Sequence, residues 1–318
     1  MTTSELIGTY LAVRRAHGVK FRTGERTLYQ FARETGDRPL AAVTAEQVSA
    51  FLRGRGALSP AWRTRYGLLV GLFRFAIARG HVAVSVLPEL HPKLPPPLTP
   101  YVYSLDEIQR LLNATAMLES PLSRLQAQTY RTLLLLLSGA GLRVSEAIAL
   151  TLGDVVLADR VLTVRDTKFY KSRRVPIGQR LAAALTTYVE QRSALPTPLG
   201  RDSAFLSSRS GHKLDYPSVV TRFQHIRTGA NIACPPGERR PPRLHDLRHT
   251  AAVHRVLAWY RDGKDVQVLL PRLATYLGHA SIASTQRYLQ MTPELLHEAS
   301  QRFAAYAQAD AEREASHA

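Results

Sequence analysis

The sequence is poor in cysteine, in acidic residues and in long apolar runs. Cys234 is the single cysteine of the 318 residues, which excludes an internal disulfide and fits a reducing compartment. The most apolar stretch, Leu133–Leu142, is about ten residues long, whereas a membrane-spanning helix needs roughly 20. The opening MTTSELIGTY lacks the basic and apolar regions of a signal peptide. We therefore expect a soluble cytoplasmic protein without a membrane partner.

Acidic residues are outnumbered by basic ones. The chain has 42 Lys and Arg against 25 Asp and Glu, a formal net charge of +17. An excess of this size, spread along the chain, indicates a polyanionic partner. The acidic residues form no motif typical of a magnesium site. We therefore expect neither a metal nor another cofactor.

The spacing of apolar residues predicts a mainly α-helical fold with a small antiparallel β-sheet, in two domains. Residues 1–90 show helical spacing and no strand signal. Residues 91–102 are rich in proline, which is typical of a semi-rigid linker. Residues 103–318 combine helical segments with two alternating stretches, 160–165 and 172–177, that predict a hairpin.

Short local signals predict where several helices begin or end. Thr44 and Ser104 are each followed three residues later by Gln or Glu, the pattern of a capping box. A glycine-rich turn places Arg143 at the head of a short helix, where Glu146 can reach back toward it. Gly278 is expected to end a helix.

One helix of the first domain is expected to present basic residues to a partner. It begins at Ser59–Pro60, runs to Arg79 and carries its leucines on one stripe. Trp62, Arg63, Arg65 and Arg74 are predicted to lie off this stripe. The three arginines are therefore candidates for contact with a polyanion.

The stretch from Arg243 to Tyr288 holds most of the candidate site. His245 and Arg248 are three residues apart, which places them near each other on one helix. On an unbroken helix, His279 and Tyr288 would point in nearly opposite directions. The break at Gly278 allows a second helix, from about 282 to 290, to carry Tyr288 back toward the other residues.

The candidate site residues share one chemistry, since all are cations or neutral donors apart from one phenol. They are Arg143, Lys168, His245, Arg248, His279 and Tyr288. Such a set suits a phosphodiester, because arginine binds the non-bridging oxygens of a phosphate through two parallel hydrogen bonds. Attack by the tyrosine would form a covalent ester and conserve the bond energy, so that strands could be rejoined without ATP.

At these residues the chain resembles the tyrosine recombinase (phage integrase) family. AGLRVSE is similar to the first arginine box of that family, and HDLRHT to its His-x-x-Arg box. LGHASIASTQRY resembles the box that joins a histidine to the tyrosine, and TKFYKSRRVP resembles the strand pair with the family lysine. The resemblance covers about residues 1–305 and implies a site-specific DNA recombinase that uses neither metal nor ATP.

The resemblance also implies a role for each residue. Tyr288 attacks the scissile phosphate and leaves a 3′-phosphotyrosyl link, while Arg143 and Arg248 bind the non-bridging oxygens. Lys168 protonates the leaving 5′-oxygen, with Lys171 as the alternative acid. His245 assists the tyrosine as base or hydrogen-bond donor, His279 donates to the phosphate, and Glu146 supports Arg143 or His245.

The domains and partners follow from the same resemblance. Residues 1–90 become a core-binding domain, and residues 103–318 a catalytic domain with a C-terminal exchange helix from Pro293 to about Ala307. The expected partner is double-stranded DNA with inverted half-sites, bound in a bacterial cytoplasm for integration, excision or resolution of a mobile element. The protein is expected to be a monomer or weak dimer alone and a homotetramer in the synaptic complex.

Further DNA contacts are expected in both domains. Besides Arg63, Arg65 and Arg74, the candidates for DNA contact are Lys171, Arg173 and Arg243.

Two other functions are alternatives to a recombinase. The first is a DNA-binding protein without catalysis, which conflicts with the presence of all six site residues. The second is a zinc hydrolase built on HDLRH, whose histidines have the spacing of zinc proteases. Against it, aspartate replaces the usual glutamate, Arg248 would lie beside the metal, and no third ligand is evident.

Overall fold

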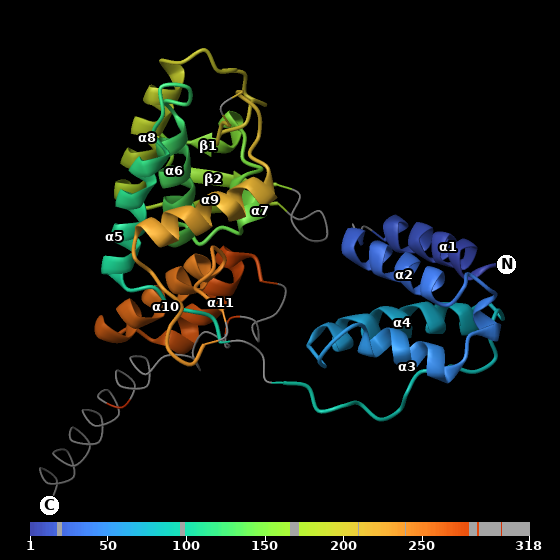
Figure 1. Cartoon of the computed structure of the whole chain (residues 1–318). Coiled ribbons are helices and arrows are strands. Elements are labelled where there is room, and N and C mark those ends of the chain that lie inside the picture. The colour runs from blue at the N-terminus through green and yellow to red at the C-terminus, as the bar shows by residue number, and fades with distance from the viewer. Residues whose placement is uncertain are drawn as a thin grey trace, which may run out of the picture. The chain divides into compact units, whose positions relative to one another are not determined.

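The computed structural model describes residues 1–17, 21–95, 99–165, 172–208, 210–238 and 240–279, together with residues 285 and 300. The chain divides into two compact units between residues 98 and 99 (Figure 1). The predicted fold class is confirmed, because the described residues are mainly helical with one small antiparallel sheet. In the described ranges, no helix has the length and apolar character that crossing a bilayer requires.

The first unit is a bundle of short helices. Its elements are α1 (Thr3–Ala16), α2 (Arg22–Glu34), the 3-10 turn η1 (Leu40–Ala42), α3 (Ala45–Arg53) and α4 (Ala61–Ala78). Helix α4 contacts each of the other three helices, and their apolar faces enclose a core that includes Phe31, Phe51 and Leu72. The predicted capping box begins α3, since Thr44 and Gln47 each bind the backbone N–H of the other.

The prediction for Trp62 was wrong. Its side chain is only 5% exposed and belongs to the core of the first unit. The ring stacks on Tyr66, with centroids 5.0 Å apart and an interplanar angle of 10°. Trp62 lies two turns before Leu69, so it is on the same side of α4 as the buried Leu69 and Ala76. The buried stripe of α4 therefore begins earlier than its leucines indicate, and a later segment of the chain covers the start of the helix.

That later segment is the start of the predicted linker. The ring of His91 lies edge-on to Trp62 and Tyr66, with centroids 5.3 and 4.5 Å away. Leu94 also packs against the core of the first unit. At the other end, Tyr103 is fully buried in the second unit, where its backbone N–H donates to Oγ1 of Thr250 over 3.0 Å. Tyr101 also packs against the core of the second unit, so both ends of the predicted linker, residues 91–102, are packed against the unit they adjoin.

The second unit is built around helix α6. Its helices are α5 (Leu105–Ala114), α6 (Gln126–Gly139), α7 (Val144–Ala147), α8 (Gln179–Ser193), α9 (Tyr216–Gly229), α10 (Asp246–Arg261) and α11 (Val266–Leu277), with 3-10 turns η2 (Thr115–Leu118) and η3 (Leu152–Asp154). Helix α6 contacts α5, α7, α8 and α10, which explains why Leu133, Leu136 and Leu137 are almost fully buried. Figure 1 shows α10 and α11 grouped at one end of this unit.

The sheet contains the predicted hairpin and one further short strand. Its order is β1 (Val155–Val156), β2 (Val161–Val164) and β3 (Arg173–Pro176), all antiparallel. In the hairpin Val164 pairs with Arg173, and Leu162 pairs with Val175. Because side chains alternate along a strand, Arg173 lies on the same face of β3 as the buried Val175.

Candidate active site

The carboxylate of Glu146 lies at the centre of the candidate site, and Arg143 is one of the residues that bind it. Gly141, whose φ of 62° suits glycine, forms the turn that places Arg143 directly before α7. The backbone N–H of Arg143 donates to Oε2 of Glu146 over 2.9 Å, and Nη1 donates to Oε1 over 2.6 Å. The sequence prediction that Glu146 reaches back to Arg143 agrees with this geometry.

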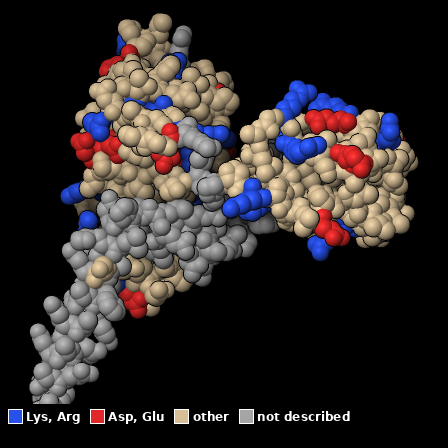
Figure 2. Space-filling model, turned by 60° about the horizontal axis from the view of Figure 1, so that its bottom comes forward, with Lys and Arg blue, Asp and Glu red and all other residues tan. Residues whose placement is uncertain are grey.

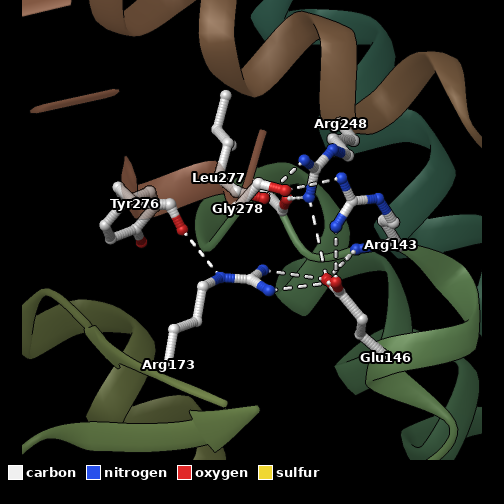
Figure 3. Close-up of polar contacts among 8 residues, drawn as sticks. Arg143, Glu146, Arg173, Arg248, Tyr276, Leu277 and Gly278 are labelled. Carbon is white, nitrogen blue, oxygen red and sulfur yellow. Dashed lines mark hydrogen bonds and ion pairs between the residues drawn. The ribbon is translucent and has the colours of Figure 1, made fainter. Parts of the chain in front are cut away.

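Arg173 reaches the same carboxylate from strand β3 (Figure 3). Its Nη1 and Nη2 atoms donate to Oε1 and Oε2 of Glu146 over 3.0 and 2.9 Å, and its Nε donates to the carbonyl oxygen of Tyr276 over 3.0 Å. The side chain is 13% exposed. We expected Arg173 to contact DNA, but each guanidinium nitrogen is engaged by an acceptor of the protein itself.

Arg248 completes the cluster from helix α10. Its Nη1 donates to the carbonyl oxygen of Gly141 over 2.6 Å and lies 3.7 Å from Oε2 of Glu146. Its Nη2 donates to the carbonyl oxygen of Leu277 over 2.7 Å. The side chain of Arg248 is 2% exposed, whereas that of Arg143 is 35% exposed. Of these two predicted phosphate ligands, Arg143 is therefore the more accessible.

The last turn of α11 is held by all three arginines. Gly278 ends the helix in the left-handed conformation, with φ at 68°, as predicted. The carbonyl oxygens of Tyr276, Leu277 and Gly278 accept hydrogen bonds from Arg173, Arg248 and Arg143, respectively (Figure 3). Carbonyls at a helix C-terminus lack partners within the helix and carry partial negative charge, so they are good acceptors for cations. The cluster thereby fixes the backbone that leads into His279.

The charges of this cluster shift the acid–base properties of Glu146. Burial alone would raise the pKa of Glu146, but hydrogen bonds from Arg173 and Arg143, with their positive charges, lower it from 4.5 to about 2. Glu146 is therefore ionised at neutral pH. Three guanidinium cations surround one carboxylate, so the cluster has an excess of two positive charges. This excess makes the site suited to an anionic group.

The histidines of the site are neutral at neutral pH. His245 directly precedes α10, and its ring centroid lies 5.2 Å from that of His249 at a right angle. Burial and the charge of Arg248 lower the pKa of His245. Burial, followed by neighbouring cationic groups, lowers the pKa of His279 to about 4, and burial lowers that of His249 to about 4. Nδ1 of His279 lies 2.8 Å from Oγ1 of the buried Thr285, a contact that sequence reasoning missed.

The structure brings together part of the predicted set. Arg143, Arg248 and Glu146 are in direct contact, and His279 follows the turn that these arginines hold. Lys168, Lys171 and Tyr288 lie outside the described residues. Within the described part of the chain, no group of three or more His, Cys, Asp or Glu residues could hold a metal ion. Asp246 of HDLRH instead pairs with Arg243, over 2.7 Å.

The other candidate DNA contacts differ in their surroundings. Arg63 and Arg74 are exposed on α4. Arg65 donates to the carbonyl oxygens of Phe51 and Leu52, at the C-terminal end of α3. Arg243 is 44% exposed but is engaged by Asp246. On the visible surface of each unit in Figure 2, basic and acidic side chains are interspersed.

The role of Arg173 was the main feature that sequence reasoning missed. A signal was available, because the alternation of β3 places Arg173 on the face of the apolar Val175. An arginine directed toward a core requires an acceptor, and a carboxylate is the strongest. The sequence did not reveal which carboxylate would meet it.

The family of this protein follows from its similarity to known proteins. Residues 102–294 match the model of the Phage integrase family. A protein of Sinorhizobium fredii (strain NBRC 101917 / NGR234) named "Putative integrase/recombinase y4rB" is 35% identical, over 95% of this chain and 96% of its own length. The tyrosine recombinase XerD of Mycobacterium leprae (strain TN) is 32% identical, over 86% of this chain and 87% of its own length.

The same fold is found in a solved structure of low sequence identity. A lambda integrase tetramer bound to a Holliday junction is similar with a TM-score of 0.65, at 19% identity, over 91% of this chain and 77% of that one. The chain therefore belongs to the phage integrase (tyrosine recombinase) family. It is an enzyme of DNA recombination, a tyrosine-type site-specific recombinase or integrase.

Proposed function

We propose that this recombinase cuts and rejoins DNA strands through a covalent 3′-phosphotyrosyl intermediate, with Tyr288 as the nucleophile. The observation that supports this proposal is the convergence of Arg143 and Arg248, from distant parts of the chain, on the turn before His279. An excess of positive charge, next to the segment that leads to a tyrosine, is what attack on a phosphodiester requires.

The proposed reaction conserves atoms and bond energy. The phenol oxygen of Tyr288 attacks phosphorus as its proton passes to His245, and the bond from phosphorus to the 5′-oxygen breaks. Lys168 supplies the proton for that oxygen, and Lys171 is the alternative donor. Arg143, Arg248 and His279 bind the non-bridging oxygens. A 5′-hydroxyl of a second strand then attacks phosphorus and gives its proton to that lysine, while the tyrosine leaves and regains its proton from His245, so that no ATP is needed.

In this mechanism the protein supplies all of the positive charge. Removal of one preorganised donor costs roughly 10²- to 10³-fold in rate in comparable oxyanion sites. Two arginines, a lysine and neutral histidines can therefore account for the stabilisation of the transition state. His245 and His279 suit these roles because their lowered pKa values keep them neutral at neutral pH.

The proposed substrate is double-stranded DNA with inverted half-sites, bound by both units. The high net charge of +17 supports a polyanionic partner. Residues 1–90 would serve as the core-binding domain and residues 103–318 as the catalytic domain. The similar lambda integrase is a tetramer on a Holliday junction, and we propose a homotetramer on DNA here too. In that assembly, Pro293–Ala307 would form the exchange helix between protomers.

The cellular task that we propose is integration, excision or resolution of a mobile element in a bacterial cytoplasm. This follows from the family and from the integrase relatives, and it defines the substrates to be tested. The natural target should lie at the ends of the element that carries the gene.

A nicked suicide substrate tests the proposed function. The wild-type protein should form a DNA adduct that survives denaturant, also in excess EDTA. Tyr288→Phe should bind the half-site equally well and form no adduct. The matched control, Tyr216→Phe, alters a half-exposed tyrosine of α9 and should form the adduct at the wild-type level. An undiminished adduct with Tyr288→Phe would assign the nucleophile to another residue, and loss in EDTA with rescue by zinc would favour a metal mechanism.

A further inference from the structure

Arg173 is buried in the site although the proposed reaction assigns it no step. Its guanidinium donates to both oxygens of Glu146 and to the carbonyl oxygen of Tyr276. These contacts engage Nε, Nη1 and Nη2, and the side chain is 13% exposed. Arg173 therefore has little capacity to bind a substrate directly. Its role must follow from its contacts within the protein.

The contacts of Arg173 join three separate segments of the second unit. The residue itself belongs to β3, Glu146 belongs to α7, and Tyr276 belongs to the last turn of α11. The same α11 turn binds Arg248 and Arg143 through the next two carbonyl oxygens. Strand β3 also follows the segment that contains Lys168. Arg173 thus connects β3 to α7 and to the end of α11.

Arg173 also determines how much positive charge is left for a substrate. The carboxylate of Glu146 binds Arg143 as well as Arg173. If Arg173 were absent, the negative charge of Glu146 would be balanced by Arg143 and Arg248 alone. Because Arg173 satisfies one lone pair on each carboxylate oxygen, Arg143 and Arg248 keep more of their charge for an anion.

The fit around Arg173 is close. A Cβ atom placed on Gly278 would lie 2.8 Å from Nη1 of Arg173, which is nearer than such atoms approach. Gly278 therefore serves two purposes, since it has a positive φ and leaves room for the guanidinium. Lysine could not replace this arrangement, because it lacks the planar fork that binds a carboxylate and a carbonyl together.

We propose that Arg173 is a positioning residue for strand cleavage, an inference that rests on the proposed function. It holds Glu146 and the end of α11 so that Arg143 and His279 face the scissile phosphate. It does not contact DNA. Small displacements of catalytic groups cost roughly 100-fold in rate, so loss of this support should lower cleavage far more than binding.

Two measurements on Arg173→Lys test the proposal. Single-turnover cleavage of the suicide substrate should fall roughly 10- to 100-fold. The affinity of Arg173→Lys for a half-site, measured by gel shift, should stay within about twofold. The salt dependence of binding should be unchanged in Arg173→Gln, which removes the positive charge. The matched control is Arg174→Lys, the same substitution at the next residue of β3, whose side chain is exposed. This control should cleave at the wild-type rate.

A double-mutant cycle tests whether Arg173 acts through Glu146. Arg173→Lys and Glu146→Gln should each slow cleavage, and the double variant should be about as slow as the slower single variant. Melting temperatures, with Arg173→Gln as a second variant, separate chemistry from folding. Cleavage rates are compared only below the lowest melting temperature.

The outcomes are distinct. A salt slope reduced by about one in Arg173→Gln would make Arg173 a phosphate contact and overturn the proposal. Cleavage by Arg173→Lys within threefold of wild type, or fully multiplicative effects in the cycle, would also overturn it. If both Arg173 variants are unfolded at the assay temperature, Arg173 is a folding residue and not a positioning residue. A wild-type protein without a Tyr288-dependent adduct would overturn the proposed function, and the positioning role with it.

Discussion

Arg248 donates from Nη1 to the carbonyl oxygen of Gly141 over 2.6 Å, although 107 residues separate them in the chain. Arg248, which the proposed mechanism uses as a cation, thus also links α10 to the turn before Arg143. We expect Arg248→Ala to lower the free energy of unfolding by about 2–4 kcal/mol, because Gly141 and Leu277 lose a buried partner. Arg143→Ala, at a residue that is 35% exposed, should cost ~1 kcal/mol. Urea denaturation measures the unfolding free energy of both variants. Equal losses would contradict the larger structural role of Arg248.

Glu146 should make stability depend on pH in the acidic range. Its pKa is about 2 in the folded protein against 4.5 as the ordinary value. A lowered pKa stabilises the fold above pH 4.5, and this stability is lost as pH falls from 4.5 toward 2. The difference corresponds to on the order of 3 kcal/mol.

Glu146→Gln isolates this effect from the other carboxylates. The gap in unfolding free energy between wild type and Glu146→Gln should be largest at pH 6–7 and shrink below about pH 4.5. Urea denaturation at several pH values gives the gap. A gap that is constant from pH 7 to pH 3 would show that ionisation of Glu146 does not stabilise the fold.

His279 should remain neutral well below neutral pH. Burial and the charges of Arg248 and Arg143 lower its pKa to about 4. Since the folded protein resists this protonation, His279 should reduce stability as pH falls from 6.5 toward 4. The NMR signal of its imidazole, assigned with His279→Gln, should not shift between pH 8 and pH 5.5. A midpoint near pH 6.5 would contradict the burial of His279 beside cations.

The salt dependence of binding should show which basic residues of the first unit contact DNA. If about eight phosphates are bound, log K should fall with log salt at a slope near −7. Arg63→Ala and Arg74→Ala, at exposed positions, should each reduce the slope by about one. Arg65→Ala should leave the slope unchanged but lower the melting temperature, because Arg65 binds the end of α3. A wild-type slope near −1 would mean that the basic surface is not the DNA interface.

The C-terminal segment should affect assembly more than binding to one half-site. Truncation after Gln290 should leave a folded protein that binds a half-site but loses cooperative pairing and most cleavage, because it removes the segment proposed to form the exchange helix. Gel-shift titration on DNA with one and with two half-sites measures this. Unchanged cooperativity would contradict the exchange, and insoluble protein would show that the helix completes the core of its own protomer.

Sequence reasoning succeeded where a signal is local. The capping boxes at Thr44 and Ser104, the contact from Glu146 to Arg143 and the helix end at Gly278 each depend on neighbours within a few residues. Spacing is enough to predict such features, since the geometry of a helix start or end is nearly fixed.

Sequence reasoning was less successful where the partner of a side chain is distant in the chain. Trp62 is buried partly because His91 covers it. Arg65 and Arg173 bind acceptors 13 to 14 and 27 or more residues away, respectively. A basic residue on a predicted surface looks the same in a sequence whether it meets DNA or a carbonyl of its own chain. Only the fold separates the two.

The three arginines hold the end of α11 through main-chain oxygens rather than through side chains. The residues at positions 276 and 277 can therefore be varied in a directed-evolution library, provided that apolar or aromatic side chains still fill the core there, as Tyr276 and Leu277 do. Changes in chain length there would instead shift every acceptor at once. Gly278 must stay fixed, since its φ of 68° and the nearby guanidinium exclude a side chain. In this turn the chain length and Gly278 are fixed, whereas the side chains at positions 276 and 277 can vary within an apolar set.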